Sequence, residues 1–90
     1  MATTTTDHDE IQRWVSDRGG YPARVKGSNK SGGSGVLRID YPGYSGDETL
    51  EAITWTEFFN GFEKNGLAFL YEDEKESRFS KLIARDQKGH

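Results

Sequence analysis

The sequence predicts an α+β fold in which two helices pack on one face of a four-stranded, mainly antiparallel sheet, in the order αββαββ. Apolar residues recur with helical spacing in two capped segments, whereas four other segments favour strands by alternation or by a continuous apolar run. Consecutive strands joined by polar turns usually pair with one another. Ninety residues supply one core, so we expect a single domain at residues 7–86, a disordered tail at 1–6 and a frayed end at 87–90.

The first element is predicted to be a helix that begins at Asp7. An aspartate can accept hydrogen bonds from the free amides of a first helical turn, and Glu10 follows three residues later, as in a capping box. The helix should end at Gly19-Gly20, because glycine accepts the left-handed conformation that closes a helix. The apolar stripe between these ends consists of Ile11, Trp14 and Val15.

Residues 21–26 and 36–41 alternate between apolar and polar side chains, which is typical of strands with one buried face. The glycine- and serine-rich segment 27–35 contains no apolar residue and is predicted to join them as a long hairpin loop. The inward-facing residues should be Ala23, Val25, Leu37, Ile39 and Tyr41. The outward-facing residues should be Arg24, Lys26, Arg38 and Asp40.

The next predicted element is a surface loop at residues 42–47, since its proline and glycines cannot continue a strand. Thr54 and Glu57 then form a second capping box, and the helix that follows should end at Asn65-Gly66. Its apolar stripe has helical spacing and is expected to lie in the core; the stripe consists of Trp55, Phe58, Phe59 and Phe62.

The final segments are predicted to be a hairpin. Residues 67–71 are apolar on both faces, as expected of a strand inside a sheet, and an acidic turn at 72–76 follows. Residues 78–85 fit either a helix or a strand, and we favour a strand that pairs with 67–71. Each half thus contains a capped helix, a glycine stop and two strands. This order hints at a duplication, although no single offset aligns both helices and strands.

The charge distribution is more informative than the net charge of −3. Residues 13–38 hold six cations and one acid, whereas residues 39–76 hold ten acids and two lysines. The segment from residue 77 onward is basic again. We therefore expect a molecule with one basic and one acidic side.

The composition disfavours an enzyme. The chain has no cysteine, which removes disulfides, thiol catalysis and Cys-ligated metals. Its two histidines, His8 and His90, lie near the ends, where neither is well placed as a base or to complete a metal site. No apolar run approaches the roughly 18 residues of a membrane span. We expect a cytoplasmic protein with no cofactor, no metal and no membrane contact.

Several short segments are distinctive as a set: Asp7-His8 with Trp14, Arg18-Gly19-Gly20, Pro22 to Gly27, Leu37 to Asp40, Ile53-Thr54-Trp55, Glu57-Phe58-Phe59, Leu67 to Tyr71 and Ser77-Arg78-Phe79. This set resembles a family of short, mostly uncharacterised prokaryotic proteins that often carry the label 1,4-alpha-glucan branching enzyme. The resemblance spans nearly the whole domain. Branching enzymes act through a (β/α)₈ domain of about 250 residues. The resemblance therefore implies a shared small domain and a glucan-associated role, and it transfers no catalytic residue.

The basic first hairpin is the best candidate for a binding site. Its cations are predicted to gather on one face, and the tyrosines at the end of its second strand suit an interface. The leading hypothesis is a small non-enzymatic module that binds a protein there, with an ordinary solvated surface as the competing interpretation. The alternatives are a nucleic-acid-binding module and a glucan-associated protein. The candidate binding residues are Arg24, Lys26, Lys30, Arg38, Tyr41 and Tyr44.

Overall fold

The structure is a computed structural model that describes residues 2–30, 32–41 and 49–85. It confirms the α+β class and both expected helices. In chain order the elements are β1 (Ala2–Thr5), α1 (His8–Asp17), β2 (Tyr21–Val25), β3 (Leu37–Asp40), β4 (Leu50–Ala52), α2 (Trp55–Lys64), β5 (Leu67–Glu72) and β6 (Ser80–Ala84).

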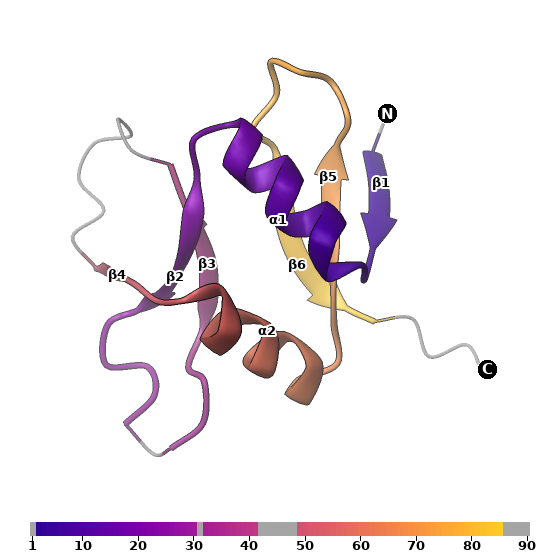
Figure 1. Ribbon diagram of the computed structural model, residues 1–90. Helices are drawn as coiled ribbons and strands as arrows, with labels where there is room; N and C mark the ends of the chain where they lie inside the picture. Colours follow the sequence, from indigo (N-terminus) through magenta and orange to yellow (C-terminus); the bar gives the residue numbers. More distant parts are fainter. Residues whose placement is uncertain (1, 31, 42–48, 86–90) are drawn as a thin grey trace.

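The strands form two three-stranded antiparallel sheets instead of one four-stranded sheet. The strand order is β1-β5-β6 in one sheet and β3-β2-β4 in the other. Both expected hairpins are present, and the strand favoured for residues 78–85 is confirmed as β6. Each hairpin gains its third strand from the other half of the chain, because β1 pairs with β5 and β4 pairs with β2. Figure 1 shows the two sheets on opposite sides of the molecule, with both helices in front of the region between them.

The two strands that sequence reasoning missed are β1 and β4. Residues 1–6 were expected to be disordered, but Ala2–Thr5 forms an edge strand on β5. Threonine is β-branched and suits a pleated surface, yet a run of threonines carries no apolar alternation that would reveal a strand. Strand β4 is only three residues long, too short for alternation to be recognised. The end predicted to fray, 87–90, lies outside the described residues.

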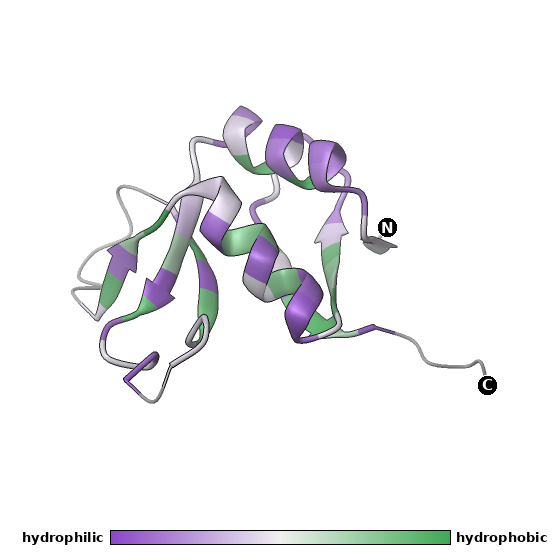
Figure 2. Cartoon of the chain, turned by 60° about the horizontal axis from the view of Figure 1, so that its bottom comes forward, coloured by the Kyte–Doolittle hydropathy of each residue, from purple (hydrophilic) through white to green (hydrophobic). Residues whose placement is uncertain are grey.

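Both helices begin at the predicted N-cap residues and bury an apolar stripe. The capping box expected at α1 is absent, because the Asp7 amide donates to Thr5 Oγ1 and Glu10 accepts from Thr5 and Tyr71 instead. The Asp7 carboxylate accepts hydrogen bonds from the amides of Asp9 and Glu10. Thr54 and Glu57 form a reciprocal capping box at the start of α2. Figure 2 shows each helix hydrophobic along one side and hydrophilic along the other. The core cluster consists of Ile11, Trp14, Val15, Leu37, Tyr41, Phe58, Phe62, Phe69 and Tyr71.

One offset of 47 residues aligns α1 and β2 with α2 and β5. It superimposes buried Ile11 on buried Phe58, and it superimposes Gly19 on Gly66, which follow the two helices with φ of 77° and 62°. The loop between β2 and β3 is four residues longer than the loop between β5 and β6, so β3 aligns with β6 at an offset of 43. This difference hides the repeat in the sequence. The two halves share the order βαββ and exchange their first strands.

Candidate binding groove

The basic patch expected on the first hairpin is divided between the two faces of its sheet. In the antiparallel ladder, Ala23 lies opposite Arg38, and Arg24 lies opposite Leu37. Opposite residues project to the same side, so Arg24 shares the side of buried Leu37 and Arg38 lies on the other side. The alternation in the sequence is compatible with either register, and a shift of one residue moves a side chain to the other face. The expectation that Arg24 and Arg38 project from one face is therefore wrong.

Two charged residues of this hairpin are already paired. The Arg24 Nε donates to Glu51 Oε2 at 2.8 Å, between β2 and β4, and the arginine side chain is only 17% exposed. The Asp40 carboxylate accepts a hydrogen bond from the Tyr21 hydroxyl at 2.9 Å. This bond is the main reason why the pKa of Tyr21 is raised. Arg24 and Asp40 therefore hold neighbouring strands together.

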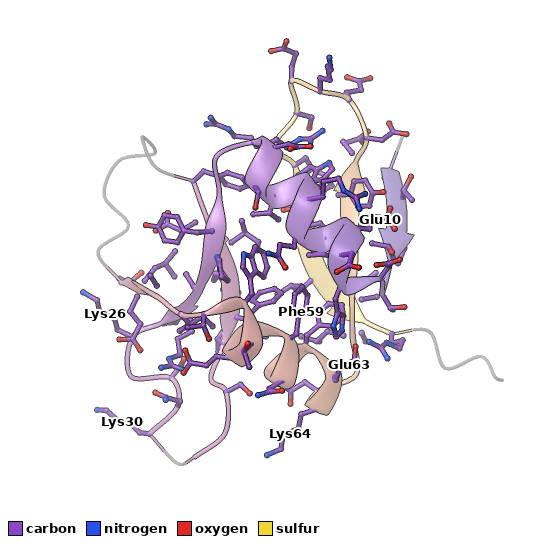
Figure 3. All side chains as sticks on the ribbon, viewed as in Figure 1. Glu10, Lys26, Lys30, Phe59, Glu63 and Lys64 are labelled. Atoms are coloured by element: carbon purple, nitrogen blue, oxygen red, sulfur yellow. The ribbon has the colours of Figure 1, made fainter. Side chains whose placement is uncertain are left out.

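The remaining predicted residues occupy three different environments. Lys26 and Lys30 are exposed and extend away from the core, at the end of β2 and in the loop after it (Figure 3). Tyr41 faces the core, as the alternation predicts, and it is only 7% exposed, so it is not an exposed interface residue. Its ring packs where Gly20 has no side chain, because a Cβ at Gly20 would lie 2.7 Å from Tyr41 Cε1. Tyr44 lies outside the described residues.

A groove of about 390 Å³ lies between β3 and β6. Three successive residues of β3 line one side, and three successive residues of β6 line the other. Successive residues of a strand project to opposite faces, so a groove that touches three in a row must run along the strand edges. Both strands are edge strands of their sheets. The lining residues are Leu37, Arg38, Ile39, Tyr41, Phe69, Arg78, Ser80, Lys81 and Leu82.

The groove has cationic side chains on its two sides and apolar side chains at its base. Arg38 and Lys81 are exposed on its opposite sides, and within the described residues neither forms an ion pair with a carboxylate. The guanidinium carbon of Arg78 lies 5.5 Å from the centre of the Tyr41 ring, within the range of a cation–π contact. No acid occurs among the described residues that line the groove. These residues together suit an anionic group attached to an apolar chain.

Arg18 positions the segment that carries Arg78. Its Nε donates to the Ser77 carbonyl at 2.6 Å, and its Nη2 donates to the Glu74 carbonyl at 2.8 Å. Its guanidinium carbon lies 4.1 Å from the centre of the Trp14 ring. The turn between β5 and β6 is therefore fastened to α1 immediately before Arg78 enters the groove.

Sequence reasoning identified Arg38 but missed Lys81 and Arg78. A signal did exist, because Arg38 and Lys81 occupy equivalent positions in the two hairpins. It becomes visible only when the hairpins are aligned strand by strand with their different loop lengths taken into account. The closeness of β3 and β6, which brings the two cations to one groove, depends on the packing of two sheets and has no local pattern in the sequence.

The aromatic stripe of α2 divides into two pairs. Phe58 and Phe62 are fully buried, as predicted. Trp55 and Phe59 also pack against the core cluster, but they are only half-buried and line a second hollow of about 380 Å³ between α1 and α2. The prediction that the stripe is core is therefore confirmed only in part for this pair. The other lining residues are His8, Asp9, Gln12, Thr56, Asn60 and Glu63.

One carboxylate at this second hollow is held by two partners. The His8 ring stacks on Phe59, with 4.1 Å between ring centres, and His8 Nε2 lies 2.7 Å from Glu63 Oε2. Figure 3 shows Phe59 and Glu63 together on α2. Arg85 donates to both Glu63 oxygens, at 3.1 and 3.2 Å. Hydrogen bonds from Arg85, and then from His8, lower the pKa of Glu63. A lowered pKa keeps the carboxylate ionised, which is the opposite of what a general acid requires.

No protein-family model, curated relative or solved structure matches this chain. Within residues 2–30, 32–41 and 49–85, no group of three or more histidine, aspartate or glutamate side chains is arranged to hold a metal ion. In the same part of the chain, neither helix is long and apolar enough to cross a bilayer. The interpretation of the groove therefore rests on its own residues.

Proposed function

We propose that this protein is a small non-enzymatic binding module that holds an acidic segment of a partner protein in the groove between β3 and β6. The observation that carries this proposal is a groove with Arg38 and Lys81 on its two sides, an apolar base and no acid in its described lining. Complementary charge steers a partner to a surface, and apolar contact then supplies affinity. The site differs from the basic hairpin face because it takes one strand from each hairpin.

A protein segment fits this groove better than a nucleic acid does. Non-specific binding of nucleic acid depends on many phosphate contacts along a basic track. Here Arg24 is neutralised by Glu51, and the exposed Lys26 and Lys30 belong to the end of β2 and the following loop and do not line the groove. The chain is also acidic overall, with a net charge of −3. A short acidic segment needs only the two or three cations that the groove provides.

The test is fluorescence anisotropy with a fluorescein-labelled peptide of ten glutamates, in low salt. The variants Arg38→Ala and Lys81→Ala should each weaken binding about two- to fivefold, since exposed charge pairs contribute up to about 1 kcal/mol. The double reversal R38E/K81E should abolish it. Lys30→Glu is the matched control, because it reverses an exposed cation outside the groove, and it should change binding less than twofold.

Two further probes separate the classes of ligand. A ten-residue peptide of lysines should not bind, and a single-stranded oligonucleotide of ten phosphates should bind more weakly than the glutamate peptide. Tighter binding of the oligonucleotide, with a steep salt dependence, would favour the nucleic-acid alternative. Equal binding of the glutamate peptide to wild type and R38E/K81E would reject the groove as the site.

A glucan-associated role is the second candidate, and the second hollow is the observation that favours it. Trp55 and Phe59 present half-buried rings beside the amides of Gln12 and Asn60. Aromatic platforms beside amide and carboxylate groups are suited to sugars. Maltoheptaose should then shift the NMR signals of Trp55 and Phe59; Trp55→Ala should abolish the shift at Phe59, and Arg38→Ala should leave it unchanged. Unchanged spectra at millimolar maltoheptaose would remove this candidate.

A further inference from the structure

One face of the sheet β1-β5-β6 carries apolar side chains that project away from the helices. Leu70 on β5 lies opposite Lys81 on β6, so both project to the same side. Ile83 lies two residues after Lys81 and shares that side. The Glu72 amide donates to the Phe79 carbonyl at 3.2 Å, which continues the ladder and places Phe79 on the same side. Leu70, Phe79 and Ile83 therefore form an apolar patch beside Lys81, which we call the outer patch.

The helices cover the other face of this sheet. Phe69 and Tyr71 project to that other face, and their rings contact Trp14 of α1 at centre distances of 5.5 and 5.4 Å. Figure 1 shows both helices on the near side of the strands. None of the three residues of the outer patch belongs to the core cluster or packs against it, and Phe79 is 49% exposed. The outer patch thus lies on a face that neither described helix covers.

The two cations of the groove border the outer patch on the same side. A Cβ added to Gly61 of α2 would lie 3.2 Å from Leu37 Cδ1, so Leu37 faces the helices. Arg38, one residue later, therefore projects away from them. Lys81 projects the same way from β6, and both cations line the groove. A ligand on this side meets apolar side chains over the sheet and two cations along one border.

A helix suits this face better than an extended segment does. Strand β5 pairs with both of its neighbours, so its backbone groups are already used and the face offers none to a chain that lies on it. An extended segment would leave its own amides and carbonyls unpaired there, whereas a helix pairs them internally. Three strands about 4.8 Å apart present a face roughly 10–15 Å wide. A helix with its side chains is about 10–12 Å across, so one helix fits.

We propose that the acidic segment is an amphipathic helix that lies on this face, with its apolar stripe on the outer patch and its acidic residues against Arg38 and Lys81. This inference rests on the proposed function and specifies the form of its partner. Opposite charge favours this occupant over a second copy of the chain, which carries the same two cations on its own outer face. The bound helix places the sheet between two helical layers and buries the apolar face that the chain leaves open.

The first test compares fluorescein-labelled peptides by fluorescence anisotropy on the full-length protein in low salt. A fourteen-residue peptide carries four leucines at i, i+4, i+7 and i+11, with a glutamate directly after each of the first three and alanine or glutamine elsewhere. It should bind at least fivefold more tightly than an isomer in which leucines and glutamates alternate, because only the helical spacing gathers the leucines on one side. Proline in place of a central alanine should weaken binding at least tenfold, because proline breaks a helix.

The second test removes the outer patch without touching the groove. Phe79→Ser should weaken the helical peptide at least fivefold and should change binding of the ten-glutamate peptide less than twofold, because Phe79 does not line the groove. Val36→Ser is the matched control, since Val36 is 45% exposed and belongs to neither the outer patch nor the groove lining. It should change binding of both peptides less than twofold. Circular dichroism checks that both variants are folded.

The outcomes separate this inference from the function on which it rests. Equal affinity of the helical peptide and its isomer, full affinity of the proline peptide, or an unchanged affinity in Phe79→Ser would overturn the helix and leave acidic-segment binding intact. If neither the helical peptide nor the ten-glutamate peptide binds, the proposed function itself fails. Sedimentation of the wild type as a dimer that Phe79→Ser returns to a monomer would overturn the helix in favour of a second copy on this face.

Discussion

The two halves of the chain share one backbone plan but fill it differently. Trp14 and Gly61 occupy equivalent positions on α1 and α2. The Trp14 indole donates to the Glu72 carbonyl at 2.8 Å and fills the contact between its helix and the strands. At Gly61 the missing side chain admits Ser34, whose Cβ would lie 2.5 Å from a Cβ added to the glycine. The space beside the helix is therefore filled by a large side chain in one half and by a residue of a neighbouring loop in the other.

A second pair of equivalent positions, Arg24 and Tyr71, shows that the side-chain interactions differ between the two halves although the backbone arrangement is shared. Arg24 on β2 and Tyr71 on β5 both lie on a central strand, and each contacts a carboxylate. Arg24 forms an ion pair with Glu51, while the Tyr71 hydroxyl donates to Glu10. The groove differs from these sites because Arg38 and Lys81 place like charge at equivalent positions. The two halves therefore differ in the interactions that stabilise them, but both place a cation at the groove.

Replacing equivalent core residues should cause the largest losses and should affect both halves. Ile11 and Phe58 are both 0% exposed. We expect Phe58→Ala to lower the free energy of unfolding by about 3–5 kcal/mol and Ile11→Ala by about 2–5 kcal/mol, since each leaves a cavity. Urea unfolding followed by circular dichroism measures both. A cost below about 1 kcal/mol for either variant would show that its half does not need the shared core.

Removing the tyrosine–carboxylate bond should cost more than removing the ion pair at the equivalent position. Tyr71→Phe should cost about 1.5–3 kcal/mol, because Tyr71 is nearly buried and its partner Glu10 is charged. Arg24→Met should cost about 0–1 kcal/mol, because Glu51 is 41% exposed. Urea titrations at pH 7 rank the two variants. The reverse order would contradict this account of the two halves.

The same tyrosine should make stability depend on alkaline pH. The hydrogen bond to Glu10, followed by burial, raises the pKa of Tyr71 from 10 to about 12. The folded state therefore holds this proton more tightly than the unfolded state, and the contribution is complete below pH 10 and is lost as pH rises toward 12. The stability difference between wild type and Tyr71→Phe should shrink over that interval. A constant difference from pH 9 to pH 12 would contradict the assignment.

Adding a side chain at Gly61 tests the difference between the helices at the equivalent positions Trp14 and Gly61. Alanine gains about 1 kcal/mol of helix propensity, but the crowding against Ser34 costs about 1–3 kcal/mol. We expect Gly61→Ala to be neutral or destabilising by up to about 2 kcal/mol, and Ser34→Gly in the same chain to restore the propensity gain. The cycle of single and double variants measures the coupling free energy between positions 61 and 34. Stabilisation by Gly61→Ala alone would show that no crowding exists.

The smallest expected effect is a loss of stability at acidic pH through Glu63. The pKa of Glu63 is lowered by Arg85 and His8, so its contribution to stability is present above its ordinary value of 4.5 and is lost as pH falls through the lowered pKa. Glu63→Gln should be slightly less stable than wild type at pH 7 and indistinguishable from it at pH 2. Paired urea titrations at the two pH values check this. A difference that grows at low pH would contradict it.

The sequence predicted the elements with local signals and failed where the signal was not local. Capping residues and helical spacing located both helices, and Gly19-Gly20 and Asn65-Gly66 located their ends. The register of β2 on β3 has no local signature, and an error of one residue placed Arg24 beside Arg38. Strand β1 carries no apolar alternation, and it becomes a strand because the edge of β5, about 65 residues away, offers it hydrogen bonds. The groove depends on the packing of β3 beside β6, which has no local pattern in the sequence, so only its β3 side was predicted.

The most direct test of the central claim is an NMR titration of the ¹⁵N-labelled protein with the ten-glutamate peptide. The account predicts that the largest shifts occur in two separate segments, 37–39 and 80–82, while Lys26, Lys30 and the Trp55 hollow change little. Shifts confined to the outer face of the first hairpin, with residues 80–82 unchanged, would contradict it. That result would return the binding site to a single hairpin.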